Sequence, residues 1–204
     1  EKTIPKFQLI ENVFEIESSE ASTKQLNDDD DDASDTKVVE TKSTIEIFKH
    51  VAVGGTFDHL HAGHKLLLSV TVAAASDIVT IGVTDDSLIQ HKKYIEYMQS
   101  YEQRSRAVIA FVHALNPNLK IQIARLTDSL GPAATDATID ALVVSHETRG
   151  GVDAANKARA DNGVAALRGV EIPLIANEAD DDGGKVSSTD LRRRSMERAQ
   201  AQHS

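Results

Sequence analysis

The residues with the clearest chemical potential lie at positions 54–64, which read GGTFDHLHAGH. Paired glycines allow the backbone to approach a phosphate closely. A helix beginning near His61 would also offer free N–H groups and a partial positive charge. His61 and His64 are three residues apart, so they would share one face of the first turn of that helix. Two imidazoles beside a helix N-terminus suit an anionic ligand, so the pattern predicts a phosphate-binding site.

Other interpretations of this segment stay open. The glycine pair could form an ordinary turn, the two histidines could only cap and pack, or His59, His61 and His64 could together hold a metal. A metal is disfavoured, because the segment lacks a complete set of ligands of the usual kind. The P-loop and the GxGxxG pattern are both absent from the chain, which excludes those two phosphate cradles.

Two further clusters could contact phosphate groups. Lys92 and Lys93 follow an expected strand after a short polar connection, although paired lysines are usually solvated surface. Residues 187–189 (Ser-Ser-Thr) precede an expected helix, where hydroxyls most often cap the helix but can also hold phosphate oxygens. A nucleophilic role for Ser145 is disfavoured, because no GxSxG elbow surrounds it.

These candidates must be positioned by apolar stretches that alternate between strand and helix character. The expected strands are 47–53, 77–83, 119–126, 139–145 and 170–176, and the expected helices are 63–75, 101–115, 147–161 and 188–200. The alternation predicts an α/β fold, a Rossmann-like doubly wound five-stranded parallel sheet with helices on both faces. Ligands bind such sheets at the carboxyl ends of the strands, where residues 54–64 are expected to lie.

The acidity of the chain is concentrated at its beginning. The net charge is −10, and residues 1–46 contain 13 Asp and Glu against 5 Lys. Five adjacent aspartates at 28–32 repel one another, and residues 18–44 offer almost nothing apolar to bury. We therefore predict a largely disordered acidic segment over residues 1–46 and one folded domain over residues 47–204.

Composition also excludes several classes of protein. The 204 residues include no cysteine, which excludes disulfide scaffolds, thiolate metal sites and thiol nucleophiles. The nearly neutral remainder of the chain argues against a nucleic-acid partner. No apolar run approaches the roughly 18 residues of a spanning helix, so no membrane partner is expected.

Three motifs together resemble a known family. GGTFDHLHAGHKLLL at residues 54–68 is similar to the first motif of the HxGH nucleotidyltransferases, and KVSSTDLR at residues 185–192 is similar to their second signature. Between them, LVVSHETRGG at residues 142–151 resembles the eukaryotic and archaeal branch of the 4′-phosphopantetheine adenylyltransferases. The resemblance covers about residues 48–195, is strongest to the fungal enzymes, and does not extend to residues 1–46.

The resemblance implies that ATP and 4′-phosphopantetheine react to give dephospho-coenzyme A and pyrophosphate, with Mg²⁺ carried on ATP. It implies catalytic roles for Thr56, His64 and Lys92. Lys92 would orient the phosphate of the acceptor, although the adjacent Lys93 leaves that register open. The substrate-binding residues that it implies are Gly55, Thr56, His61, His64, Lys92, Arg149, Arg159, Ser187, Ser188 and Thr189.

Two other functions stay open beside this one. A sister cytidylyltransferase or adenylyltransferase with another phosphorylated substrate would share the first motif, and an inactive nucleotide-binding scaffold would share the fold. We expect the adenylyltransferase, because residues 142–159 resemble that branch and the motif residues are intact. We also expect a cytoplasmic enzyme without a resident metal, and a monomer rather than an oligomer.

Overall fold

The structure is a computed structural model and describes residues 46–172 and 187–202. Its strands are β1 (Phe48–Gly55), β2 (Ala75–Thr84), β3 (Lys120–Leu126), β4 (Ala141–Val144) and β5 (Arg168–Glu171). Its helices are α2 (Ala62–Ala74), α3 (Tyr101–Leu115), α4 (Gly150–Asp161) and α5 (Ser188–Ala201). Short 3₁₀ turns lie between them: η1 (Asp86–Leu88), η2 (Ile95–Tyr97), η3 (Gly131–Ala134) and η4 (His146–Thr148).

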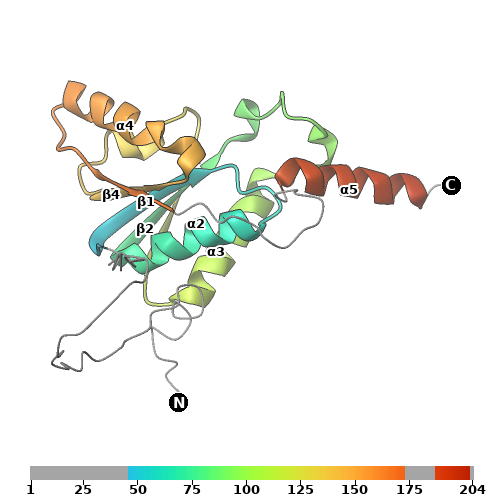
Figure 1. Cartoon of the computed structure of the whole chain (residues 1–204), viewed down its shortest axis with the longest axis horizontal. Helices are drawn as coiled ribbons and strands as arrows, with labels where there is room; N and C mark the ends of the chain where they lie inside the picture. Colours follow the sequence, from blue (N-terminus) through green and yellow to red (C-terminus); the bar gives the residue numbers. More distant parts are fainter. Residues whose placement is uncertain (1–45, 173–186, 203–204) are drawn as a thin grey trace, which may run out of the picture. The chain divides into compact units, whose positions relative to one another are not determined.

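The strands form one parallel sheet in the order β3-β2-β1-β4-β5. From β1 the chain builds outward through β2 to β3, then returns to the other side of β1 to add β4 and β5. Helices α2 and α3 lie against one face of the sheet and α4 lies against the other (Figure 1). The predicted Rossmann-like, doubly wound α/β fold is therefore confirmed. The strand order reverses beside β1, which is where sheets of this kind bind ligands.

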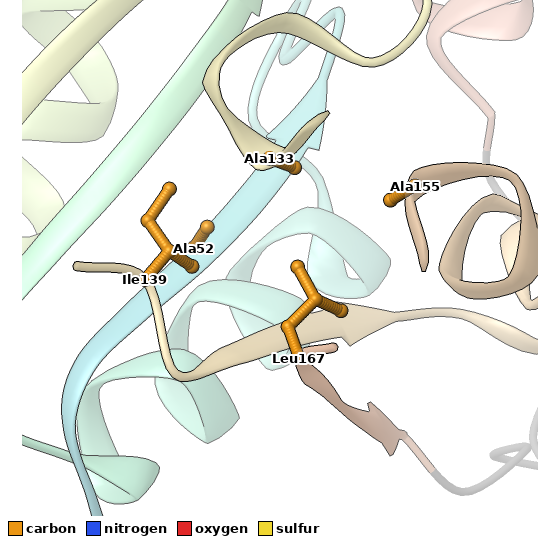
Figure 2. Packing of buried hydrophobic residues seen from close by; sticks show 5 residues of the cluster. All are labelled: Ala52, Ala133, Ile139, Ala155 and Leu167. Atoms are coloured by element: carbon orange, nitrogen blue, oxygen red, sulfur yellow. The ribbon is translucent and has the colours of Figure 1, made fainter. Parts of the chain in front are cut away.

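Both faces of the central strands are buried, as their apolar sequences require. On one face, β1 and β2 contribute side chains that are at most 2% exposed: Val51, Val53, Val79, Ile81 and Val83. The opposite face carries a cluster of smaller residues, shown in Figure 2: Ala52, Ala133, Ile139, Ala155 and Leu167. Three of these five residues are alanines, whose small side chains let α4 and η3 approach the sheet.

The predicted elements agree with the structure in order and type, with differences at their ends. The helix expected over 147–161 is divided into η4 and α4, because Gly150 and Gly151 follow the turn and the regular helix begins only there. The strand expected over 170–176 starts earlier, at Arg168, where it pairs with β4. Residues 173–176 lie outside the described part of the chain.

Two predictions concern residues that the structure does not describe. The acidic segment 1–46 lies outside the described residues except for Glu46, so its predicted disorder stays a prediction. Lys185, the first residue of the second motif, also lies outside them. Among the residues described, none of the helices has both the length and the hydropathy needed to cross a membrane.

Candidate active site

The loop after β1 has a tightly fixed backbone. Phe57 and His59 have positive φ angles of 53° and 46°, a conformation that non-glycine residues rarely adopt. Asp58 lies between them, is fully buried, and accepts a hydrogen bond at Oδ1 from the Gln99 backbone N–H at 3.0 Å. Its Oδ2 accepts from Arg192 Nη1 at 2.5 Å. This buried ion pair holds the loop in a conformation that its residues would otherwise disfavour.

The loop leads into the N-terminus of α2, where the two motif histidines meet. His61 is the N-cap residue, and its side chain makes no capping hydrogen bond to the first turn. The His61 and His64 rings are stacked, with centroids 3.8 Å apart and planes 25° from parallel. The Phe57 ring packs against His64 at 5.4 Å. The predicted pairing of the two imidazoles at a helix N-terminus is therefore present.

His64 is neutral at physiological pH in the protein without ligand. Burial of the ring, together with the neighbouring His61 and Lys92, lowers its pKa to about 3. Its Nδ1 is buried and has no hydrogen-bond partner among the described residues. A buried polar atom without a partner costs free energy, and a ligand could satisfy it.

Lys92 reaches the same place from the loop after β2. Its Nζ donates a hydrogen bond to Thr56 Oγ1 at 3.3 Å, so the two predicted catalytic groups are in direct contact. Burial lowers the pKa of Lys92. The positive charges of Arg192 and Arg104 also lower it, whereas the negative charge of Asp58 raises it. Lys93 is exposed, and its carbonyl accepts from Arg192 Nε at 3.0 Å. The geometry therefore favours Lys92 over Lys93 as the residue that faces the loop after β1.

The start of α5 joins this group through its hydroxyl residues. Ser187 and Asp190 form a reciprocal capping box that begins the helix. The next residue, Ser188, donates from Oγ to the Asp58 carbonyl at 2.8 Å, and Thr189 Oγ1 accepts from Arg192 Nη2 at 3.1 Å. The Ser187 hydroxyl is therefore used to cap the helix, and the Thr189 hydroxyl is bonded to Arg192. The Ser188 hydroxyl attaches α5 to the loop after β1.

The two arginines predicted as substrate ligands have different surroundings. Arg149 is exposed at the N-terminus of α4, at the same edge of the sheet as the first motif. Arg159 is 1% exposed, and its guanidinium donates to four backbone carbonyls, those of Ala133, Asp136, Ile139 and Ala165. Every nitrogen of that guanidinium is therefore engaged within the fold. The prediction for Arg159 is corrected: it ties α4 to η3 and to the start of β4, and does not face a ligand.

A cavity of about 230 Å³ adjoins the first motif on the α4 face of the sheet. It begins at Gly54 and Gly55 and extends between β4, η3 and α4. Its walls are mostly aliphatic, including Leu126, Leu130, Ala133, Leu142, Val144 and Ala155. A ligand anchored at Thr56 could therefore extend an uncharged arm into this cavity.

Sequence reasoning missed three residues on which the site depends: Asp58, Arg104 and Arg192. Each is buried, at 0% to 1% exposure, and each bonds to residues far away in the chain. Asp58 lies in the first recognised motif and Arg192 in the second, so membership of a motif was the sequence signal that could have identified them. Arg104 lies in an ordinary amphipathic helix, and no local pattern distinguishes it from the exposed Arg106.

The histidines do not converge as a metal site would require. The His61 and His64 rings stack on each other, whereas His59 Nε2 lies 3.0 Å from the Tyr97 carbonyl oxygen. Over residues 46–172 and 187–202, no three His, Asp or Glu side chains are grouped so that they could hold a metal ion. The arrangement is instead suited to binding anions at a helix N-terminus.

A sequence model of the family described as cytidylyltransferase-like matches residues 52–194, from the middle of β1 to the middle of α5. The chain belongs to the cytidylyltransferase-like family. A phosphopantetheine adenylyltransferase of Saccharomyces cerevisiae is 40% identical over 148 residues, which are 72% of this chain and 48% of that protein. Two archaeal proteins of the same name, from Methanopyrus kandleri and Pyrococcus abyssi, are 42% and 37% identical, and the match covers 89% of each and 71% of this chain.

The chain is also similar to a solved structure and to proteins of different length. A crystal structure of a protein of unknown function from Archaeoglobus fulgidus has a TM-score of 0.54 and 27% identity, covering 69% of this chain and all of that one. The chain spans about half the length of the two fungal relatives, from Saccharomyces cerevisiae and Schizosaccharomyces pombe. The part that it shares with the archaeal family members is nearly their whole length.

Proposed function

We propose that this protein transfers the adenylyl group of ATP to 4′-phosphopantetheine, giving dephospho-coenzyme A and pyrophosphate. The observation that carries the proposal is the contact between Lys92 Nζ and Thr56 Oγ1, 3.3 Å apart. The stacked histidines lie in the same motif, and the preceding Gly54 and Gly55 line an aliphatic cavity. It is supported by relatives named phosphopantetheine adenylyltransferase, of which those in archaea match along nearly their full length.

The acceptor is held at its two ends in this proposal. Its phosphate binds the Lys92 ammonium and the Thr56 hydroxyl, because a charge-assisted bond to phosphate is stronger than a neutral one. Its uncharged arm enters the cavity that begins at Gly54 and Gly55, where aliphatic walls favour apolar groups. A phosphorylated acceptor without such an arm would leave this cavity empty and bind less well.

ATP is held at the other side of the same helix end. The uncapped first turn of α2 and the imidazoles of His61 and His64 face its phosphates, and Ser188 and Arg149 lie at the neighbouring rims. Because its pKa is about 3, His64 arrives neutral and can donate one N–H without carrying a charge of its own. An approaching phosphate then makes protonation of that imidazole more favourable, because an opposite charge stabilises the charged form.

The reaction requires positioning more than acid–base chemistry. An oxygen of the acceptor phosphate attacks the α-phosphorus of ATP. The bond to the β-phosphate oxygen breaks, and pyrophosphate leaves. A phosphate monoester has a second pKa near ~6, so it is already anionic at pH 7 and no general base is needed. Lys92, the α2 N-terminus and the two imidazoles bring two anions together and stabilise the charge that grows on the α-phosphate.

Mg²⁺ is the remaining component of the proposal. Within residues 46–172 and 187–202, no three His, Asp or Glu side chains are grouped so that they could hold the ion. We propose that Mg²⁺ enters on the ATP phosphates, as it commonly does with nucleotides. The absence of cysteine is compatible with the reducing cytoplasm, where we propose that the reaction takes place. The monomeric state stays a prediction.

A panel of nucleotides and acceptors tests the proposed function. Pyrophosphate release is measured for ATP, CTP, GTP and UTP, each with phosphopantetheine and with glycerol 3-phosphate, and the product is identified by mass spectrometry. Only ATP with phosphopantetheine should give pyrophosphate, in equal amount to dephospho-coenzyme A. Release from CTP with glycerol 3-phosphate alone would assign a sister activity. Tight ATP binding without any release would assign a scaffold.

A further inference from the structure

Arg104 is a fully buried arginine in the first turns of α3, and all of its guanidinium nitrogens are engaged. Nε donates to the Gln99 carbonyl at 3.0 Å, and Nη1 donates to the Thr56 carbonyl at 2.6 Å. Nη2 donates to the Thr84 carbonyl at 2.8 Å and to Asp86 Oδ1 at 2.6 Å. The Arg104 side chain therefore donates to three backbone carbonyls and one carboxylate around the site.

These four acceptors belong to the two segments that carry the phosphate-binding groups. Thr56 follows β1, and its hydroxyl accepts the hydrogen bond from Lys92. Thr84 ends β2, and Asp86 begins the connection that contains Lys92 and runs on to Gln99. The guanidinium thus fastens the carboxyl end of β1 to both ends of the segment that presents Lys92.

We propose that Arg104 is a positioning residue for adenylyl transfer, which holds Thr56 and Lys92 at the separation needed to bind the acceptor phosphate. This inference rests on the proposed function. Arginine suits the task because its planar fork presents donors in several directions at once. A lysine at the same position would keep the charge but could reach only part of the four acceptors, which lie on different sides of the guanidinium.

The chain contains a matched control in Arg159. It is also a buried helix arginine, at 1% exposure, and it also donates to four acceptors, all of them carbonyls. Its bonds tie α4 to η3 and to the start of β4, and none of them reaches Thr56 or the segment of Lys92. Replacing either arginine by lysine removes comparable bonds from the interior, so a general loss of stability affects both variants.

The experiment compares Arg104→Lys with Arg159→Lys in the full chain. For each, kcat and KM are measured for phosphopantetheine and for ATP, with rates divided by the folded fraction found by circular dichroism. Arg104→Lys should lower kcat/KM for phosphopantetheine by about 100-fold, the usual effect of displacing reacting groups by about 1 Å. The KM for ATP should change by less than about three-fold. Arg159→Lys should stay within about three-fold in every parameter.

Equal losses in the two variants would overturn the inference and make Arg104 a structural residue only. If Arg104→Lys does not fold, the inference is tested by comparing the variants Asp86→Asn and Asp85→Asn. Asp86 bonds to Arg104, whereas the adjacent Asp85 pairs with Arg125. Asp86→Asn should lower kcat/KM for phosphopantetheine by about three- to ten-fold and Asp85→Asn should not, since a neutral amide is a weaker acceptor for a guanidinium. Equal effects would overturn the inference.

The unaltered chain separates failure of this inference from failure of the proposed function. If it forms no dephospho-coenzyme A from ATP and phosphopantetheine, the proposed function is wrong. If it does so and the two arginine variants behave alike, only the role of Arg104 is wrong.

Discussion

Lowering the pH from 7 to 5 should destabilise the ligand-free protein through His64. In the folded chain the pKa of this imidazole is lowered to about 3, first by burial and then by His61 and Lys92. In the unfolded chain it returns to its ordinary value near ~6.5. A lowered folded-state pKa means that the unfolded chain takes up the proton first. The stability is therefore fully present above about pH 6.5 and is lost as the pH falls toward 3.

The size of the effect follows from the two pKa values. At pH 5 the unfolded imidazole is mostly protonated, whereas the folded one is essentially neutral. Linkage then gives a loss of about 2 kcal/mol in the free energy of unfolding between pH 7 and pH 5 from this one group. His64→Gln removes the titration and keeps a polar side chain. The variant should therefore lose about 2 kcal/mol less than the unaltered protein over the same pH interval.

Urea unfolding at pH 5, 6 and 7 measures this difference. The control variant is His113→Gln, which makes the same substitution at an exposed imidazole in the last turn of α3. Carbon-13 NMR of labelled histidine gives an independent reading, because His64 should show no titration step between pH 5 and pH 8. An identical pH dependence in all three proteins, or a His64 signal with a midpoint near 6.5, would refute the reasoning.

Three further changes have expected outcomes. His64→Ala should lower kcat by about 10²–10³-fold without loss of folding, as measured by pyrophosphate release, since it removes a donor to the reacting phosphates. Lys92→Ala should weaken phosphopantetheine binding by about 10- to 150-fold in calorimetry while Lys93→Ala should not, and the opposite ranking would move the role to Lys93. Gly131→Ala should cost about 2 kcal/mol or more in urea unfolding, because φ is +51° and the added Cβ would overlap Leu126; an unchanged midpoint would contradict this.

The fold was predictable because its strongest signals are local. Val79 to Val83 and Ala141 to Val144 are apolar on both faces, and only a covered parallel sheet buries both faces of a strand. The end of β1 was predictable for a related reason, since a glycine pair followed by a helix start marks a strand–helix junction. Less predictable were the ends of elements, as at β5, whose start at Arg168 is set by its tertiary pairing with β4.

The candidate site was predictable where a single segment carries several of its groups. Thr56, His61 and His64 lie within nine residues, so sequence spacing alone brings the two histidines together at one helix end. Lys92 required the additional rule that carboxyl ends of parallel strands share one edge of the sheet. Its hydrogen bond to Thr56 joins residues 36 positions apart and depends on the β1–β2 pairing.

The interior arginines could not be interpreted from their sequence surroundings. Arg104 and Arg159 each stand in a helix among small and polar residues, and nothing local shows which carbonyls their donors will meet. Their roles depend on partners as far as 48 residues away for Arg104 and 26 for Arg159. The resemblance assigned Arg159 to a ligand, and burial with four carbonyl acceptors shows why that assignment fails.

The cations of the site divide into two kinds, and the division bears on how it binds anions. Arg104 is buried and paired with Asp86, and Arg192 is buried and paired with Asp58. Their other N–H groups donate to backbone and hydroxyl oxygens. Within the described residues the Lys92 ammonium forms no salt bridge and bonds only to a hydroxyl, and its pKa is lowered by burial and by the two arginines nearby. An incoming phosphate can therefore pair with Lys92 without displacing a carboxylate, and the added negative charge raises the pKa of Lys92. The buried arginines supply the geometry, and Lys92 retains its charge for the substrate.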